Sequence, residues 1–164
     1  MAALSCVLML VSYFPYLTYA VPAVAGLCVM AVLIEAGALY AFLCYVSASV
    51  LSFLIAEKEA AFMFICLFGF YPIVKAFIER IRKSVPEWII KILLFNACAV
   101  VSYYAVTLIL GVPAEEFAFI GKYGIYIFLA LCNVAFVLYD IALSKTAVFY
   151  MQKIHGIVKK IFKK

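Results

Sequence analysis

The chain has 164 residues, of which 71% are hydrophobic and 13% are charged, and its mean hydropathy is +1.24. A soluble domain of this length cannot bury so much apolar surface, so the composition excludes a soluble globular protein and predicts an all-α, polytopic integral membrane protein. A span needs about 20 apolar residues, which leaves room for roughly five to seven spans. The net charge of +5 is concentrated in two basic clusters. Such clusters indicate cytoplasmic surfaces near anionic lipid or a partner, and not a nucleic-acid site.

The first two apolar segments, residues 2–14 and 21–34, are expected to be helices joined by a tyrosine-rich turn. This turn, YFPYLTY, contains Pro15, Tyr16 and Tyr19. Tyrosine favours the membrane interface, because its ring is apolar and its hydroxyl group prefers water. The first segment corresponds to about 20 Å of helix. Either the first helix is short, or the sequence starts inside a longer one.

The third segment, residues 39–56, carries a ladder of small residues spaced four apart, and the first segment repeats the pattern more weakly. Small residues at this spacing allow another helix to approach closely. The docking candidates from the two ladders are Cys44, Ala48, Ser52, Ala2 and Cys6. The charged turn that follows, residues 57–59, is either a solvated turn or the rim of an outward-facing pocket.

The fourth segment, residues 60–77, contains Gly69 and Pro72. Proline lacks a backbone N–H and clashes with the carbonyl group four residues earlier, so a kink is predicted near Phe68. Near the end of this segment, Lys75 and Glu79 are four residues apart on one helix face, and they are expected to pair.

A basic hinge, FYPIVKAFIERIRKSVPEWIIK at residues 70–91, follows in the middle of the chain. Its basic residues are Lys75, Arg80, Arg82, Lys83 and Lys91. Because Lys and Arg that flank spans are retained in the cytoplasm, the hinge is predicted to be an inner loop. The same inner surface, at Arg80, Arg82 and Lys83, is a candidate docking surface for an energising partner.

In the fifth segment, residues 88–110, two polar residues follow the first after seven and eleven residues. In the sixth segment, which runs from residue 117 or 119 to 143, polar residues are seven apart. Each set therefore forms a stripe on one helix face. Polar groups inside a membrane are expensive, which makes the two stripes a candidate pocket for a small ligand. With the outer tyrosines, the predicted substrate-binding residues are Tyr16, Tyr19, Asn96, Tyr103, Thr107, Tyr126 and Asn133. The alternative is that these side chains only bond helix to helix, for about 1 kcal/mol each. Asp140, next in the second stripe, is expected near the inner end, where solvent can reach it.

The pattern changes after Ser144, where apolar residues recur at helical spacing among five lysines that follow residue 150. Residues 144–164 are therefore predicted to form an amphipathic basic helix on the inner membrane surface, and residues 1–143 a domain of six transmembrane helices. Six crossings with the hinge inside place both termini in the cytoplasm. The predicted location is the cell membrane.

Catalysis is not expected. The six cysteines are scattered singly, and His155 is the one histidine of the chain, so the sequence offers neither a metal site nor a base for a nucleophile. Glycine patterns for binding nucleotide phosphates are missing from the sequence, so the chain is not expected to hydrolyse ATP. No cofactor is predicted.

The opening MAALSCVLML and the stretch PYLTYAVPAVAGLCVMAVLIEAGALYAFLCYVSASVLSFLI resemble the first three helices of the substrate-binding S component of energy-coupling factor transporters, or of a small bacterial membrane protein with a similar six-helix layout. The resemblance implies a six-helix fold that binds a vitamin-like small molecule from outside. It also implies a separate membrane coupling subunit and two ATPase subunits as partners. In that family the ligand pocket lies in the outer half of the membrane, under the first outer loop.

Two other functions remain open from the sequence. The chain could be a non-transporting membrane scaffold or assembly protein, whose small-residue ladders and basic tail contact a protein partner or membrane lipid. It could also be a self-sufficient small channel or carrier, although no selectivity filter is recognisable.

Overall fold

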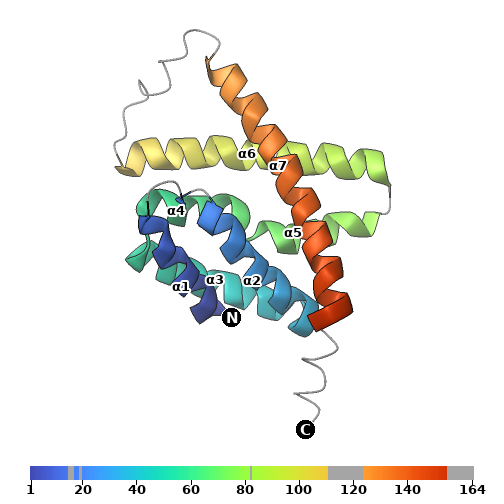
Figure 1. Cartoon of the computed structure of the whole chain (residues 1–164). Coiled ribbons are helices and arrows are strands. Elements are labelled where there is room, and N and C mark those ends of the chain that lie inside the picture. Colours follow the sequence, from blue (N-terminus) through green and yellow to red (C-terminus); the bar gives the residue numbers. More distant parts are fainter. Residues whose placement is uncertain (15–16, 19, 82, 111–123, 155–164) are drawn as a thin grey trace.

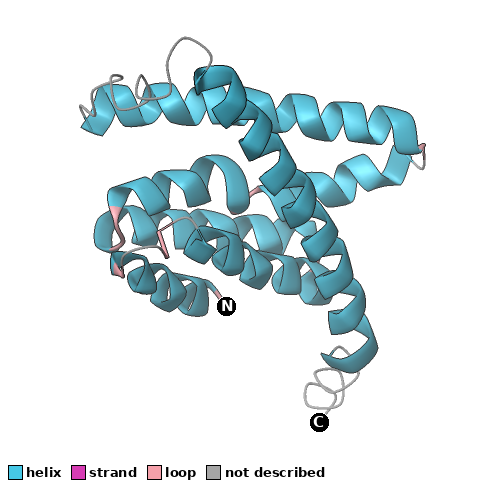
Figure 2. Ribbon diagram, turned by 45° about the horizontal axis from the view of Figure 1, so that its top comes forward, coloured by secondary structure: helices cyan, strands magenta, loops and turns pink. Residues whose placement is uncertain are grey.

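The computed structural model describes residues 1–14, 17–18, 20–81, 83–110 and 124–154, and for residues 84, 103–110, 124–128 and 154 it describes only the helix to which they belong. All regular structure in these ranges is helical (Figures 1 and 2), which confirms the predicted all-α class. In chain order the elements are α1 (Ala2–Leu10), η1 (Val11–Tyr13), α2 (Ala20–Ala36), α3 (Ala38–Ile55), α4 (Lys58–Met63), η2 (Phe64–Phe68), α5 (Tyr71–Ile78), η3 (Glu79–Ile81), α6 (Ser84–Leu110), α7 (Gly124–Phe149) and η5 (Tyr150–Ile154).

Four helical stretches of the described chain are long and apolar enough to cross a membrane. They are Ala38–Ile55, Lys58–Ile81, Val85–Ser102 and Leu129–Lys153. Two further apolar helices, Ala2–Tyr13 and Ala20–Ala36, are shorter. These four helices are compatible with the membrane class that the composition predicts, and the count of six crossings stays a prediction.

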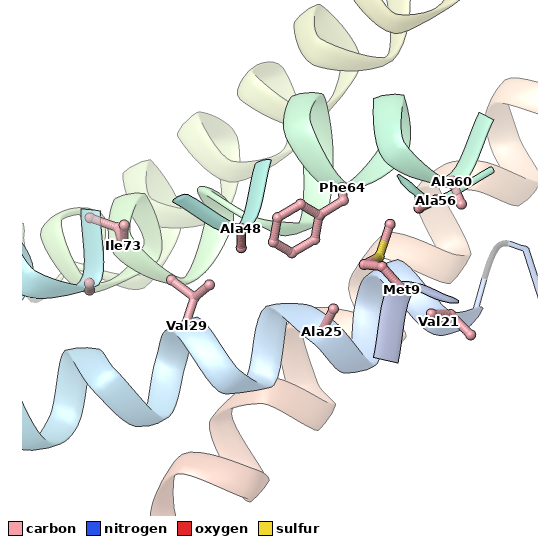
Figure 3. Close-up of a cluster of buried hydrophobic side chains, with 10 residues drawn as sticks. Met9, Val21, Ala25, Val29, Ala48, Ala56, Ala60, Phe64 and Ile73 are labelled. Carbon is pink, nitrogen blue, oxygen red and sulfur yellow. The ribbon is translucent and has the colours of Figure 1, made fainter. Parts of the chain in front are cut away.

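The N-terminal helices pack around a core of small residues. Gly37, with φ of 90°, makes the tight turn between α2 and α3 that a side chain would strain. Phe64 is fully buried and fills the space that the alanines leave (Figure 3). The buried members of this cluster are Met9, Val21, Ala25, Val29, Ala41, Ala48, Ala56, Ala60, Phe64 and Ile73.

The small-residue ladder on α3 faces into this core. Cys44, Ala48 and Ser52 are at most 9% exposed, and Ala48 belongs to the cluster of Figure 3. The ladder does admit close helices, as its spacing predicts, but these helices belong to the same chain. Cys6 is also buried, whereas Ala2 is half-buried. The four buried residues therefore offer no surface to a separate subunit in this structure.

The predicted irregularity near Phe68 is confirmed. The helix that begins at Lys58 changes to a π-helical segment at Phe64–Phe68, where the Gly69 N–H donates to the Phe64 carbonyl group at 2.7 Å. Pro72 cannot donate to the Phe68 carbonyl group, and this oxygen instead lies against Gly26 of α2. The irregularity thus lets α2 approach the α4–α5 segment closely.

The helix ends alternate between two sides of the molecule. In Figure 1 the turn between α2 and α3, the end of α5 and the end of α7 lie toward the right, while the ends of α1, α3 and α6 lie toward the left. Helix α7 crosses the α5–α6 hairpin obliquely in both views (Figures 1 and 2), and it continues through residue 144 without a break to Phe149. Residues 144–154 of the predicted tail therefore continue α7 and η5, and residues 155–164 lie outside the described residues.

Candidate functional site: a buried charge network

Five ionisable side chains meet where α7 crosses the α5–α6 hairpin. Four elements supply them, three consecutive and one distant in the sequence: Lys75 (α5), Glu79 (η3), Glu87 and Lys91 (α6), and Asp140 (α7). The two lysine side chains are 8% and 2% exposed, and the Asp140 side chain is 4% exposed. These three groups are therefore withdrawn from water, and they need partners within the protein.

Each lysine ammonium group has three oxygen partners. Lys75 Nζ donates to Asp140 Oδ1 and to the Asp140 carbonyl oxygen at 3.1 Å, and it forms an ion pair with Glu79 Oε1 at 3.0 Å. Lys91 Nζ donates to Glu87 Oε1 at 2.7 Å, to Glu79 Oε1 at 3.0 Å and to Asp140 Oδ2 at 3.3 Å. Because an ammonium group has three donors, these bonds use all the donors of Lys91. The predicted pairing of Lys75 with Glu79 is confirmed.

The Asp140 carboxylate is the centre of the network. Its Oδ1 accepts from Lys75 and from the Tyr71 hydroxyl group, which lies at 2.5 Å, and its Oδ2 accepts from Lys91. Ser144 donates to the Asp140 carbonyl oxygen at 3.0 Å. The expectation that solvent reaches Asp140 is therefore wrong, since α5 and α6 enclose the carboxylate.

The network lies inside the apolar spans. Lys75 is six residues, about 9 Å of helix, before the end of the Lys58–Ile81 span, and Lys91 is equally far after the start of the Val85–Ser102 span. Two of the five basic residues of the predicted hinge thus leave its surface. Arg80 and Lys83 remain exposed as predicted, and the side chain of Arg82 is outside the described residues. Glu79 is 42% exposed and connects the network to the hinge.

Aromatic side chains cover the network on the side away from the hinge. The rings of Phe95 and Phe136 stack with 4.4 Å between centroids, and the ring of Tyr71 meets Phe136 edge to face at 5.0 Å. The carboxylate is thus sealed by rings in one direction and by Glu79 and Glu87 in the other. Such an enclosure strengthens every charge interaction within it.

The two asparagines predicted to bind substrate bond each other. Asn96 Nδ2 donates to Asn133 Oδ1 at 3.0 Å, and Asn133 Nδ2 donates to Asn96 Oδ1 at 3.1 Å. Each amide also donates to the carbonyl group four residues earlier, at 2.8 and 2.9 Å. The stripes on α6 and α7 therefore face each other as expected, but all four amide hydrogens are used. This geometry favours the alternative of interhelical bonding.

For the other predicted substrate-binding residues the structure does not describe the side chains. Tyr103, Thr107 and Tyr126 lie on α6 and α7 where only the helix is described, and Tyr16 and Tyr19 lie outside the described residues. Their part in a pocket stays a prediction.

The described part of the chain includes a small cavity and an open hollow. A cavity of about 10 Å³ between Phe68, Tyr71, Phe95 and Tyr139 has room for one water molecule. An open hollow of about 480 Å³ lies at the other end of the helices, beside Tyr13, Phe53, Leu54 and residues 56–59. The charged turn at 57–59 is thus the rim of a hollow, one of the two roles expected for it. Glu57 is held there by the Thr18 hydroxyl group at 2.9 Å.

The sequence contained a signal for the network, although the interpretation of the hinge as a basic surface loop assigned Lys75 and Lys91 to the surface. Lys75 with Glu79, and Glu87 with Lys91, are two i,i+4 pairs within the hinge, one before and one after residues 80–83, and Asp140 is an acid inside an apolar segment. An acid at that depth requires a cation from another span. The buried α7 residues Phe136, Asp140 and Leu143 also keep the spacing of a helix–helix seam.

Comparison with protein-family models, with curated proteins and with solved structures gives no match for this chain.

Proposed function

We propose that this chain is the membrane-embedded, substrate-binding subunit of a transport system for a small molecule. The observation that carries the proposal is the charge network between helices long enough to cross a membrane. Ionisable side chains buried among membrane spans commonly belong to substrate or ion pathways, because they are costly to keep there. Apolar packing would join the same helices at least as well, since a buried ion pair is often neutral or worse than its apolar replacement.

The open hollow lies at the helix ends opposite the hinge, and it supports binding of a substrate from that face of the molecule. Its volume of about 480 Å³ is within the usual range for small-molecule sites. Tyr13 and Phe53 supply aromatic surface, while Glu57 and Glu59 supply charge. A substrate received there would be separated from the hinge by the length of the helices.

The proposed topology has six crossings, with both termini in the cytoplasm of a bacterial cell and the hollow outside. It is supported by the exposed basic residues Arg80 and Lys83 at the hinge and by Lys145 and Lys153 near the end of α7. The end of α5 and the end of α7 both lie toward the right in Figure 1. By its resemblance to energy-coupling factor S components, the chain would act on a vitamin-like molecule, with a membrane coupling subunit and two ATPase subunits docking at this side.

The test is to purify the protein from its native membranes and to identify copurified proteins and small molecules by mass spectrometry. We expect an ATPase pair, a coupling subunit and a metabolite whose readdition raises the thermal stability of the chain. Uptake of that metabolite into cells should be lost in Lys75→Met, whereas Lys145→Gln, an exposed lysine on α7, should transport normally. Uptake that survives Lys75→Met in folded protein would refute a role of the network in transport. Flux through liposomes containing the chain alone would identify a channel or carrier.

The second candidate is a non-transporting scaffold, and the Asn96–Asn133 pair favours it. Two residues predicted to receive a ligand instead join α6 to α7. A scaffold would copurify with a membrane protein or lipid but with no metabolite and no ATPase. That outcome would replace the transport proposal.

A further inference from the structure

Three donors on the α5–α6 hairpin converge on one carboxylate group. Tyr71 and Lys75 donate to one oxygen of Asp140, and Lys91 donates to the other at 3.3 Å. Two ammonium groups and a hydroxyl group, each directed at a different lone pair, are the donor set that a protein uses to bind a free carboxylate.

The carboxylate and its donors come from different elements. All three donors lie on α5 or α6, whereas Asp140 is 65 residues from Lys75 and 49 residues from Lys91. The hairpin also orients its own lysines, because Glu79 Oε1 lies 3.0 Å from both ammonium groups and Glu87 accepts from Lys91 at 2.7 Å. The two lysines are thus held in place by carboxylates other than the one at the centre of the network.

Charge balance allows the carboxylate to be exchanged. With all five groups ionised, two lysines face three carboxylates, so the network has a net charge of −1. If Asp140 leaves, two lysines and two glutamates remain and the hairpin is neutral. A monoanion that enters restores the original charge, and it meets the same three donors.

We propose that the α5–α6 hairpin is a binding site for a small carboxylate anion, and that Asp140 occupies it as a tethered carboxylate of the same chain. A free carboxylate that reaches the site competes with Asp140 for Lys75, Lys91 and Tyr71. When it binds, α7 loses the bonds that its Asp140 carboxylate makes to the hairpin. The inference concerns binding, and it holds whether or not the chain takes part in transport.

The experiment is chemical rescue of Asp140→Ala, a variant that keeps the donors and removes the tethered carboxylate. Its thermal unfolding is followed in detergent micelles during titration with sodium formate, against sodium chloride at equal ionic strength. We expect formate to raise the unfolding temperature of Asp140→Ala with saturation, and not to raise that of the wild type, in which Asp140 already occupies the same donors. Formamide, which has the shape of formate without its charge, should have no effect.

Two control variants separate a site from a general salt effect. Asn133→Ala, which removes a polar side chain from the same helix away from the lysines, should not respond to formate. Asp140→Ala combined with Lys75→Met and Lys91→Met should also lose the response. The proposal is overturned if folded Asp140→Ala melts at the same temperature in both salts, or if the response persists without the lysines.

If Asp140→Ala yields no folded protein in chloride, the readout becomes its recovery when purified in formate. Monodisperse protein in formate but not in chloride supports the site, and equal loss in both salts overturns it.

Discussion

Asp140 is the residue through which α5, α6 and α7 are joined by charge. Lys75 and Lys91 are almost fully buried, so each depends on this carboxylate for part of its compensation. Removing one charged side chain therefore lowers the free energy of unfolding by more than the ion pair itself contributes, because the remaining charges stay buried without a partner.

Asp140→Asn is expected to lower the free energy of unfolding by about 3–5 kcal/mol, the range for removing one partner of a buried ion pair. Titration of the purified protein with a denaturing detergent measures the change. Lys145→Gln, on the exposed face of α7, should change stability by less than about 0.5 kcal/mol.

The triple variant Lys75→Met, Lys91→Met and Asp140→Leu should recover most of this loss, because buried ion pairs can often be replaced by apolar packing without net cost. A triple variant less stable than Asp140→Asn would show that the charges themselves hold the helices together.

Gly26 is a second position where a small substitution should affect stability, because the added Cβ atom would disturb the packing of α2. A Cβ atom there would lie 2.7 Å from the Phe68 carbonyl oxygen and 2.8 Å from Tyr139 Oη. The carbonyl group cannot withdraw, because it belongs to the backbone of the π-helical segment. We expect Gly26→Ala to cost about 1–3 kcal/mol through overpacking. In the same assay Val24→Ala, at an exposed position of α2, should be nearly neutral, and equal stability of the two variants would contradict the close approach of α2.

At the scale of elements, α6 and α7 are held together by layers along one seam. The asparagine pair forms one layer, the stacked Phe95 and Phe136 rings the next, and the charge network the last. Tyr71 joins the ring layer to the charge network, because its ring contacts Phe136 and its hydroxyl group donates to Asp140, so these two layers should be coupled in their contributions to the attachment of α7.

Asn96→Ala and Asn133→Ala should each lower stability by about 0.6 kcal/mol or slightly more, the typical worth of a polar contact between membrane helices. The double variant should be no less stable than either single variant, because each substitution already breaks the shared pair. A full double-mutant cycle of unfolding measures this coupling. Additive losses would contradict the pair, and lost ligand binding with unchanged stability would restore the predicted pocket.

At the scale of the whole molecule, the alternation of helix ends assigns the hinge and the turn at 57–59 to opposite faces (Figure 1). Exposed Lys58 and Lys83 mark the two faces. In a variant without native cysteines, Lys58→Cys should react with a membrane-impermeant maleimide added outside intact cells, and Lys83→Cys should react only after the cells are opened. Labelling of both positions from one side would refute the six-crossing topology.

Composition and periodicity predicted the helices well, because hydrophobicity and helix-breaking residues act locally. The interruption near Phe68 follows from Gly69 and Pro72, and the orientation of Asn133 and Asp140 follows from a spacing of seven. The small-residue ladder predicted a close approach on α3, but spacing cannot say whether the approaching helix comes from another subunit or from the same chain.

The sequence by itself determined that the chain is helical, with helices apolar enough to cross a membrane, and that polar stripes run along α6 and α7. Only the tertiary structure decided that Lys75 and Lys91 leave the basic hinge and turn inward to Asp140. The reason is physical: the sequence fixes the face of a helix on which a residue lies, but contacts across 49 and 65 residues depend on where α7 crosses the hairpin. At that crossing a buried carboxylate and two buried ammonium groups are each too costly to remain without the others.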